Sequence, residues 1–257
     1  MRVAIRPTPR GSAPFTVAES GGYRVRFTGS PAVCEGVLIN TGGGMTGGDV
    51  LQLRCDLGEA AEAVLTTQAA EKIYRSDGPE TEISIDLTLA ARSRLAWLPQ
   101  EQILFDGARL RRTLGASLAH DAALTLVEST VLGRHAMGET LRSGLLRDRW
   151  RIRRGGRLVL AEEVRLEGDM TQALARKALG GGARATATFL HIEPDAERML
   201  EPARALLAGS KSETGTTAFD GMLVARFLSP DPHVLRTELA RFLEGFLRRP
   251  LPRSWQT

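Results

Sequence analysis

The chain has 257 residues, of which 42% are hydrophobic and 25% are charged, and it carries a net charge of +4 at pH 7. This composition excludes a disordered chain, because enough apolar side chains are present to form a packed core. No apolar stretch approaches the roughly 20 residues that a membrane-spanning helix needs, and MRVAIRPTPRGSAPF at the start lacks the hydrophobic segment of a secretory signal, so we expect a cytoplasmic protein.

Alternation of apolar and polar residues, which is typical of half-buried strands, dominates the first three quarters of the chain. In VLQLRCDL, residues 50–57, the leucines and Cys55 share one face, and TEISIDLTLA, residues 81–90, repeats the pattern. Further strands are predicted at residues 23–27, 36–40, 62–68, 93–99, 123–132, 184–193 and 221–229. Residues 148–166 split around Gly155 and Gly156 into two runs, as a hairpin does.

Helical spacing of apolar residues appears only late in the sequence, at residues 194–208 and 232–249. The second stretch begins at Pro232, a residue suited to a first helical turn, and places its leucines and phenylalanines on one stripe. The first stretch contains Pro202, so we expect either a kinked helix or two short turns. No repeat or charged linker divides the chain, which predicts a single, mostly β domain over residues 1–257 with two packed helices in its C-terminal part.

A glycine-rich stretch, INTGGGMTGGDVL at residues 39–51, resembles a phosphate-binding loop at first sight. Such loops continue into a helix whose N-terminus faces the anion, whereas here Gly48 is followed by an acid, Asp49, and a predicted strand. The pattern favours a tight connection between two strands. A nucleotide-dependent enzyme that uses residues 42–48 with Glu71 and Lys72 is the alternative.

Two acidic residues lie on otherwise apolar strand faces, Glu128 in ALTLVESTVL and Glu162 in LVLAEEVRL. A carboxylate on an apolar face is costly unless it is paired, hydrogen-bonded or bound to a cation. These residues therefore indicate either buried salt bridges with arginines or a polar path through the interior. Glu71, in TTQAAEKIYRS, is a weaker case because it adjoins a predicted turn.

A basic run, RDRWRIRRGGR at residues 147–157, alternates charged residues with Trp150 and Ile152. This alternation favours a strand face turned to solvent or to a partner. A basic nucleic-acid-binding β protein is a further alternative, which predicts steeply salt-dependent binding through this run.

Five stretches in fixed order, LINTGGGMTGGDVL, TTQAAEKIYRS, WLPQEQILFDGARL, LGRHAMGE and the terminal LPRSWQT, resemble the urease accessory protein UreD (UreH) family. The resemblance runs from about residue 36 to the C-terminus and implies a mainly β fold of stacked, solenoid-like sheets with two α-helices. It also implies no catalysis by the chain itself. The family acts as a scaffold for nickel insertion into urease.

The resemblance further implies the partners of the chain: apo-urease, a UreF-type accessory protein and, through UreF, a UreG-type GTPase, in a dimer of the accessory complex. No tightly bound cofactor, nucleic acid or membrane is implied. Nickel would pass transiently along an internal route lined by acids at the matching motifs, namely Asp49, Glu71, Glu128 and Glu162. Oxygen ligands suit a conduit, because carboxylates hold nickel less tightly than imidazole or thiolate groups do. A structural salt bridge remains the alternative for each acid.

Overall fold

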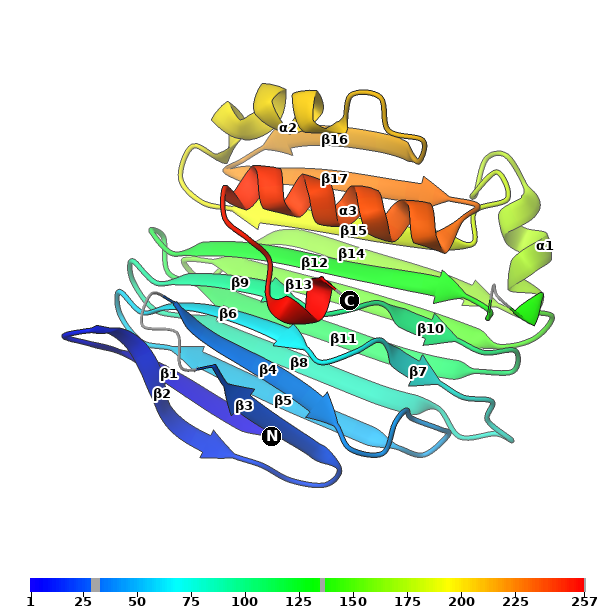
Figure 1. Ribbon diagram of the computed structural model, residues 1–257, viewed down its shortest axis with the longest axis horizontal. Helices are drawn as coiled ribbons and strands as arrows, with labels where there is room; N and C mark the ends of the chain where they lie inside the picture. The colour runs from blue at the N-terminus through cyan, green and yellow to red at the C-terminus, as the bar shows by residue number, and fades with distance from the viewer. Residues whose placement is uncertain (29–32, 135–136, 257) are drawn as a thin grey trace.

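The computed structural model describes residues 1–28, 33–134 and 137–256, and its strands form two sheets that face each other (Figure 1). The first sheet has the order β14-β13-β11-β8-β5-β1-β2. In that order its strands are Arg157–Glu167, Leu145–Arg154, Arg109–Leu118, Thr81–Leu89, Val50–Leu57, Arg2–Thr8 and Gly11–Ala18.

The second sheet has the order β16-β17-β15-β12-β9-β6-β4-β3, and two short strands lie off this path: β10 pairs with β12, and β7 pairs with β10. The eight strands of this order are Glu213–Phe219, Met222–Ser229, Ala185–Ile192, Ala123–Leu132, Arg94–Leu98, Glu62–Thr67, Cys34–Asn40 and Tyr23–Phe27. The short strands β10 and β7 are Gln102–Leu104 and Glu71–Ile73.

The middle of the chain winds as a coil in which each turn adds one strand to each sheet. Strands β4, β6, β9 and β12 pair in parallel in the second sheet, and β5, β8, β11 and β13 do so in the first. At one end of the coil β1 pairs in parallel with β5, and the antiparallel strands β2 and β3 flank β1 and β4. At the other end β14 to β17 are all antiparallel to their neighbours. The stacked, solenoid-like β fold is thereby confirmed.

In the part of the chain that the structure describes, the coil is followed by α1 Met170–Ala175, η2 Ala196–Met199, α2 Leu200–Leu207, α3 Pro232–Leu247 and η3 Arg253–Trp255, where η marks a short 3-10 helix. Helix α3 begins after Asp231, whose side chain accepts hydrogen bonds from the backbone of His233 and Val234. It lies on the outer face of the second sheet, over β15 and β17 (Figure 1). Around Pro202 the predicted helix is in fact two pieces, η2 and α2.

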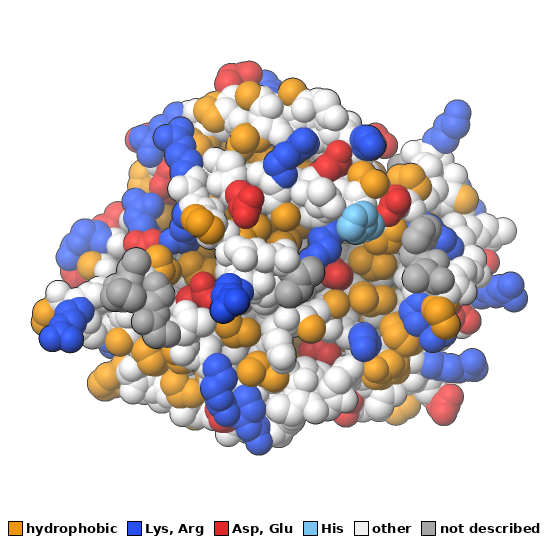
Figure 2. Space-filling view, viewed as in Figure 1, with side chains coloured by type: hydrophobic (Ala, Val, Ile, Leu, Met, Phe, Trp, Pro, Cys, Tyr) orange, Lys and Arg blue, Asp and Glu red, His pale blue; other side chains and the backbone are white. Residues whose placement is uncertain are grey.

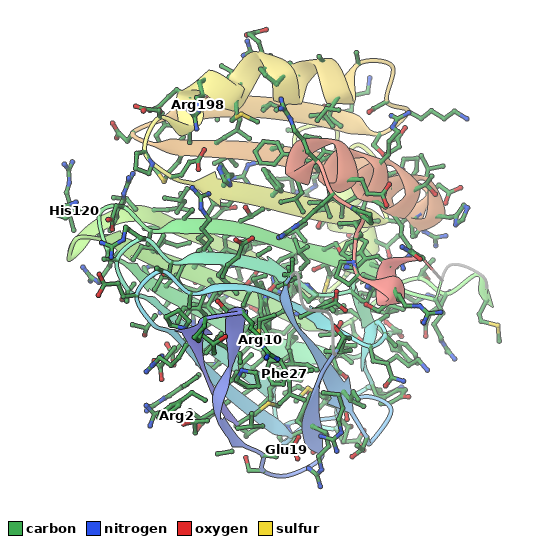
Figure 3. All side chains as sticks on the ribbon, turned by 60° about the vertical axis from the view of Figure 1, so that its left-hand side comes forward. Arg2, Arg10, Glu19, Phe27, His120 and Arg198 are labelled. Carbon is green, nitrogen blue, oxygen red and sulfur yellow. The ribbon has the colours of Figure 1, made fainter. Side chains whose placement is uncertain are left out.

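Two apolar cores hold these layers together. One lies between the sheets, and the other lies between the second sheet, α2, α3 and the last residues. Strand β12 has an apolar layer on each side, so almost all of its residues are buried. Figure 3 shows the axis of the stack from another side, with Arg2 and Glu19 toward its N-terminal end and Arg198 at the far end.

Most predicted strands lie within two or three residues of their observed positions, and the Gly155-Gly156 hairpin is confirmed, with positive φ at both glycines. The sequence analysis did not identify six strands, β1, β2, β7, β10, β11 and β16, or the short helix α1. No helix among the described residues is long and apolar enough to cross a membrane.

Candidate functional site

The glycine-rich stretch connects β4 of one sheet with β5 of the other. A Cβ on Gly47 would lie 2.1 Å from the Ser76 hydroxyl oxygen and 2.7 Å from the Pro79 carbonyl oxygen, so the close approach is to the protein's own chain. Strand β5, not a helix, begins directly after the loop. The helix N-terminus that the nucleotide-binding alternative requires is therefore replaced by a strand, and the strand-connection prediction is confirmed.

Asp49 ends this loop and lies at the surface. Its Oδ2 accepts a hydrogen bond of 2.8 Å from the backbone N–H of Thr46, which holds the carboxylate against the turn. Asp49 lines a depression of about 440 Å³ together with Tyr23, Asn40 and Leu51. The same three residues also line a deeper cavity between the two sheets.

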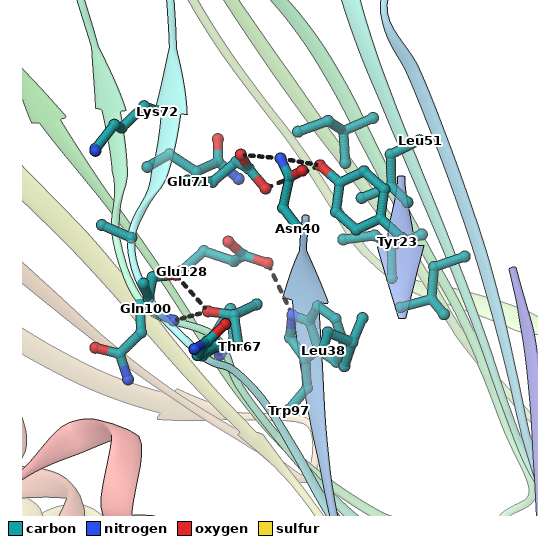
Figure 4. Close-up of a pocket in the computed structure, with 18 of the residues that line it drawn as sticks. Tyr23, Leu38, Asn40, Leu51, Thr67, Glu71, Lys72, Trp97, Gln100 and Glu128 are labelled. Atoms are coloured by element: carbon teal, nitrogen blue, oxygen red, sulfur yellow. Dashed lines mark hydrogen bonds between the residues drawn. The ribbon is translucent and has the colours of Figure 1, made fainter. Parts of the chain in front are cut away.

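The deeper cavity, which we call the central cavity, has a volume of about 290 Å³ and contains Glu71 near its outer side (Figure 4). The two Glu71 carboxylate oxygens accept hydrogen bonds from Tyr23 Oη at 2.8 Å and from Asn40 Nδ2 at 2.7 Å. Burial raises the pKa of the Glu71 carboxyl, against the opposing effect of these two donors. Among the described residues no cationic side chain joins this hydrogen-bonded group of Tyr23, Asn40 and Glu71, so Glu71 is a half-buried carboxylate held by neutral donors.

Glu128 lies at the inner side of the central cavity, on β12. Its Oε1 accepts a hydrogen bond of 2.8 Å from Trp97 Nε1, and its Oε2 is paired with the Arg112 guanidinium. The side chains of Glu128 and Arg112 are each only 2% exposed. Burial raises the pKa of the Glu128 carboxyl, while Arg112 and Trp97 oppose that effect.

Arg112 also binds a second carboxylate, that of Asp148 on β13, through Nε at 2.9 Å and Nη2 at 2.5 Å. Asp148 lies directly beside Arg112 in the register of β11 and β13. The indole N–H of Trp150 donates to both Asp148 oxygens at 3.1 Å. Arg112 thus spans the interior, from its own sheet to Glu128 in the facing sheet.

The sequence analysis missed Arg112 and Asp148, although alternation could have identified both. Arg112 occupies an inward position between Leu110 and Leu114 of β11. Asp148 shares its strand face with Trp150, which is buried. The prediction of a solvated face for residues 147–157 fits the arginines there but is wrong for Asp148.

Glu162 lies on β14 and pairs with Arg226 of the facing sheet, at 2.6 and 2.9 Å. It lines a small cavity of about 50 Å³ with Glu128, Arg112 and Asp148, among others; we call this the inner cavity. The salt-bridge alternative therefore describes the contacts of Glu128 and Glu162, whereas Asp49 and Glu71 are held by uncharged groups.

The four predicted acids follow one another along three adjoining hollows. Asp49 lines the surface depression, Glu71 the central cavity and Glu162 the inner cavity, while Glu128 lines both the central and the inner cavity. Within residues 1–28, 33–134 and 137–256, no three His, Cys, Asp or Glu side chains gather in a way that could hold a metal ion. Chemically, the arrangement offers single carboxylates in sequence rather than a closed coordination site.

Several arginines of residues 147–157 have partners within the protein. Arg147 and Arg149 pair with Glu163, and Arg154 donates to the backbone oxygen of His120. On the face shown in Figure 2, basic side chains are spread among acidic and apolar ones instead of forming a stripe. Neither observation supports the nucleic-acid alternative, which requires a continuous basic surface.

Comparison with known proteins gives one consistent family. The family model described as UreD urease accessory protein matches residues 1–256. A urease accessory protein UreD of Methylobacterium sp. (strain 4-46) is 53% identical, covering 94% of this chain and 88% of the relative. Urease accessory protein UreD 3 of Methylorubrum extorquens (strain PA1) is 48% identical, covering 99% of this chain and 89% of the relative. The urease accessory protein UreD of Azorhizobium caulinodans is 43% identical, covering 99% of this chain and 94% of the relative.

Proposed function

Because this chain belongs to the UreD family of urease accessory proteins, and so has a role in urease maturation, we propose that it is a scaffold through which nickel reaches apo-urease. Its relatives are named as accessory proteins, which indicates a role beside the enzyme rather than in its chemical step. In this proposal the chain binds apo-urease and a UreF-type protein, and it meets a UreG-type GTPase through UreF in a dimeric complex.

The observation that carries the nickel route is the series of three adjoining hollows, each lined by at least one of Asp49, Glu71, Glu128 and Glu162. A divalent cation that leaves water needs oxygen ligands at each step, and single carboxylates bind it weakly enough to release it. The route begins at Asp49, which is exposed, and continues past Glu71, whose carboxylate has no cationic partner in its hydrogen-bonded group.

The surface of the chain supports the scaffold role. Strand β2 is an edge of the first sheet, and it exposes 74% of Phe15 and 43% of Val17. Exposed apolar side chains on an unpaired strand edge suit a protein that is covered by partners. We place this scaffold in the cytoplasm as part of the proposal.

The nickel route is tested by removing charge at its first two positions with little change of shape. We expect Asp49→Asn combined with Glu71→Gln to leave co-purification with apo-urease and UreF unchanged, while the nickel content of urease falls by more than half. The reason is that an amide oxygen attracts a divalent cation less than a carboxylate does. Nickel per urease active site is measured by elemental analysis of the purified enzyme.

Asp77→Asn is the matched control, because Asp77 is a fully solvated acid on the neighbouring loop and lines none of the three hollows. Normal nickel content in the double variant would reject the route. Failure of the unmodified chain to associate with either apo-urease or UreF would reject the scaffold.

A further inference from the structure

The central and inner cavities meet at a single charged cluster of three side chains. Glu128 lines both cavities, and Arg112 and Asp148 line the inner one. The Arg112 guanidinium bridges the two carboxylates across the space between the sheets. In the proposed route, an ion that moves from the central to the inner cavity passes Glu128, which lines both, and so comes within reach of the guanidinium paired with it.

The charge of the cluster does not balance. One guanidinium faces two carboxylates, so the three side chains carry a net charge of −1 whenever both carboxylates are ionised. Uncompensated charge is costly away from water. A divalent cation in place of the guanidinium would make the cluster neutral, whereas a monovalent cation would not.

Each carboxylate is also held by a second group that does not depend on Arg112. Trp97 donates to Glu128 and Trp150 donates to Asp148, one indole from each sheet. Both carboxylates therefore stay oriented when the guanidinium moves away. Such support by neighbouring donors is what positions the ligands of metal sites.

A further oxygen without a partner lines the central cavity. The side chain of Gln102 is 93% buried and lines the central cavity with Glu128, and its Oε1 has no hydrogen-bond partner among the described residues. A buried acceptor without a partner is unusual. Its strand, β10, pairs with β12 at Thr130, two residues beyond Glu128.

We propose that Arg112 is a gate: its guanidinium holds the place between Glu128 and Asp148 that a divalent cation takes, and it must swing aside for the cation to pass. This inference rests on the proposed nickel route and adds to it two residues, Arg112 and Asp148. It also gives the route a preference for divalent over monovalent ions, because only a double charge matches the two carboxylates.

The test removes the guanidinium and measures binding of Ni²⁺ to the purified full-length chain. We expect Arg112→Met to bind one Ni²⁺ at least about tenfold more tightly than the unmodified chain, because the competing cation is gone. The gain should disappear in Arg112→Met/Asp148→Asn. Calorimetric titration gives the affinity, and the Ni²⁺-dependent rise in Tm gives an independent readout.

Arg111→Met is the matched control, since Arg111 is the next residue of the same strand and pairs with Glu80 at the surface. If Arg112→Met folds only when Ni²⁺ is present, that dependence itself supports the gate. If it does not fold at all, Arg112→Lys, which keeps the charge but cannot bridge both carboxylates, replaces it and should show a smaller gain. Unchanged Ni²⁺ affinity in a folded Arg112 variant would overturn the gate.

Different results would contradict the nickel route and the Arg112 gate. If the Asp49/Glu71 double variant lowers the nickel content of urease while Arg112→Met gains no Ni²⁺ affinity, the route stands and the gate is wrong. If Arg112→Met gains affinity while the double variant delivers nickel normally, the route is wrong, and Glu128 and Asp148 form only a closed cation site.

Discussion

At the scale of single residues, the carboxylates between the sheets differ in the groups that compensate their negative charge. Glu128 and Asp148 share one guanidinium, whereas Glu71 relies on Tyr23 and Asn40, which are neutral. Burial raises the pKa of Glu71 from its ordinary value of 4.5, and the hydrogen bonds from Asn40 and Tyr23 oppose this effect only in part. The folded protein is therefore less stable when Glu71 is ionised than when it is protonated.

This difference predicts a pH dependence of stability. Since the pKa of Glu71 is higher in the folded than in the unfolded chain, its contribution to stability is largest below pH 4.5 and is lost as the pH rises through the raised pKa. Glu71→Gln cannot ionise, so we expect it to gain free energy of unfolding relative to the unmodified chain as the pH rises from 4.5 to 7. Urea denaturation across this range measures the difference. Glu201→Gln, at a largely exposed side chain, is the control, and parallel pH curves for Glu71→Gln and the unmodified chain would contradict the prediction.

At the scale of elements, the loop between β4 and β5 positions the outer part of the candidate route. Asn40 accepts a hydrogen bond from the backbone of Gly42 and donates to both Gly44 and Glu71, so one side chain ties the loop to the acid. The loop packs on the segment around Ser76 and Pro79 without room for a side chain at Gly47.

Gly47→Ala should therefore destabilise the protein by about 1–3 kcal/mol, because the added methyl group overlaps the Pro79 carbonyl oxygen and forces the two loops apart. Chemical denaturation gives this difference. Gly215→Ala in β16, where an added Cβ meets nothing within 4 Å and φ is not positive, serves as the control and should be close to neutral. Equal stabilities of the two variants would show that the loop contact is not tight.

Strands whose inward positions are all apolar could be predicted from the sequence, as β5 and β8 show. Strand β11 was not identified, because Arg112 interrupts the row of apolar residues at its inward positions, although the row continues on both sides of it. Arg112, the charged residue at this inward position, is also the residue that forms the candidate gate. Glu128 was identified because a lone acid on an apolar face is conspicuous, whereas its partner was hidden among many arginines.

The contacts of the four acids could not be derived from local pattern, since each depends on a residue far away in the chain. Glu162 meets Arg226, 64 positions later, and Glu71 meets Tyr23, 48 positions earlier. Period-two alternation states which side of a strand a residue faces, but not which residue faces it from the other sheet.

At the scale of the whole molecule, the last residues close the second core. Trp255 is buried beside α3 and the second sheet, and its indole N–H donates to the Leu98 carbonyl of β9 at 3.0 Å. The Arg236 guanidinium of α3 lies over the Trp255 ring at 5.3 Å. The C-terminal segment therefore joins the helix layer to the middle of the coil.

Trp255→Ala should lower the free energy of unfolding by about 3–5 kcal/mol, as expected for loss of a large buried aromatic side chain. Trp255→Phe keeps most of the ring and loses the hydrogen bond, so a loss of about 1 kcal/mol is expected. Denaturant titration of both variants separates the contribution of ring packing to the free energy of unfolding from that of the hydrogen bond. A similar loss in the two variants would contradict a packing role.

The parallel coil also has a consequence for how the chain reaches this structure. Each turn pairs with the preceding one, as Cys34 does with Ala63 and Glu62 with Arg94, so partners are about 30 residues apart throughout the middle of the chain. A sheet of this kind can grow in the order of synthesis, with every finished turn acting as the template for the next. Until β14 and β15 are in place, however, the growing end presents open strand edges, and the chain is then most exposed to aggregation.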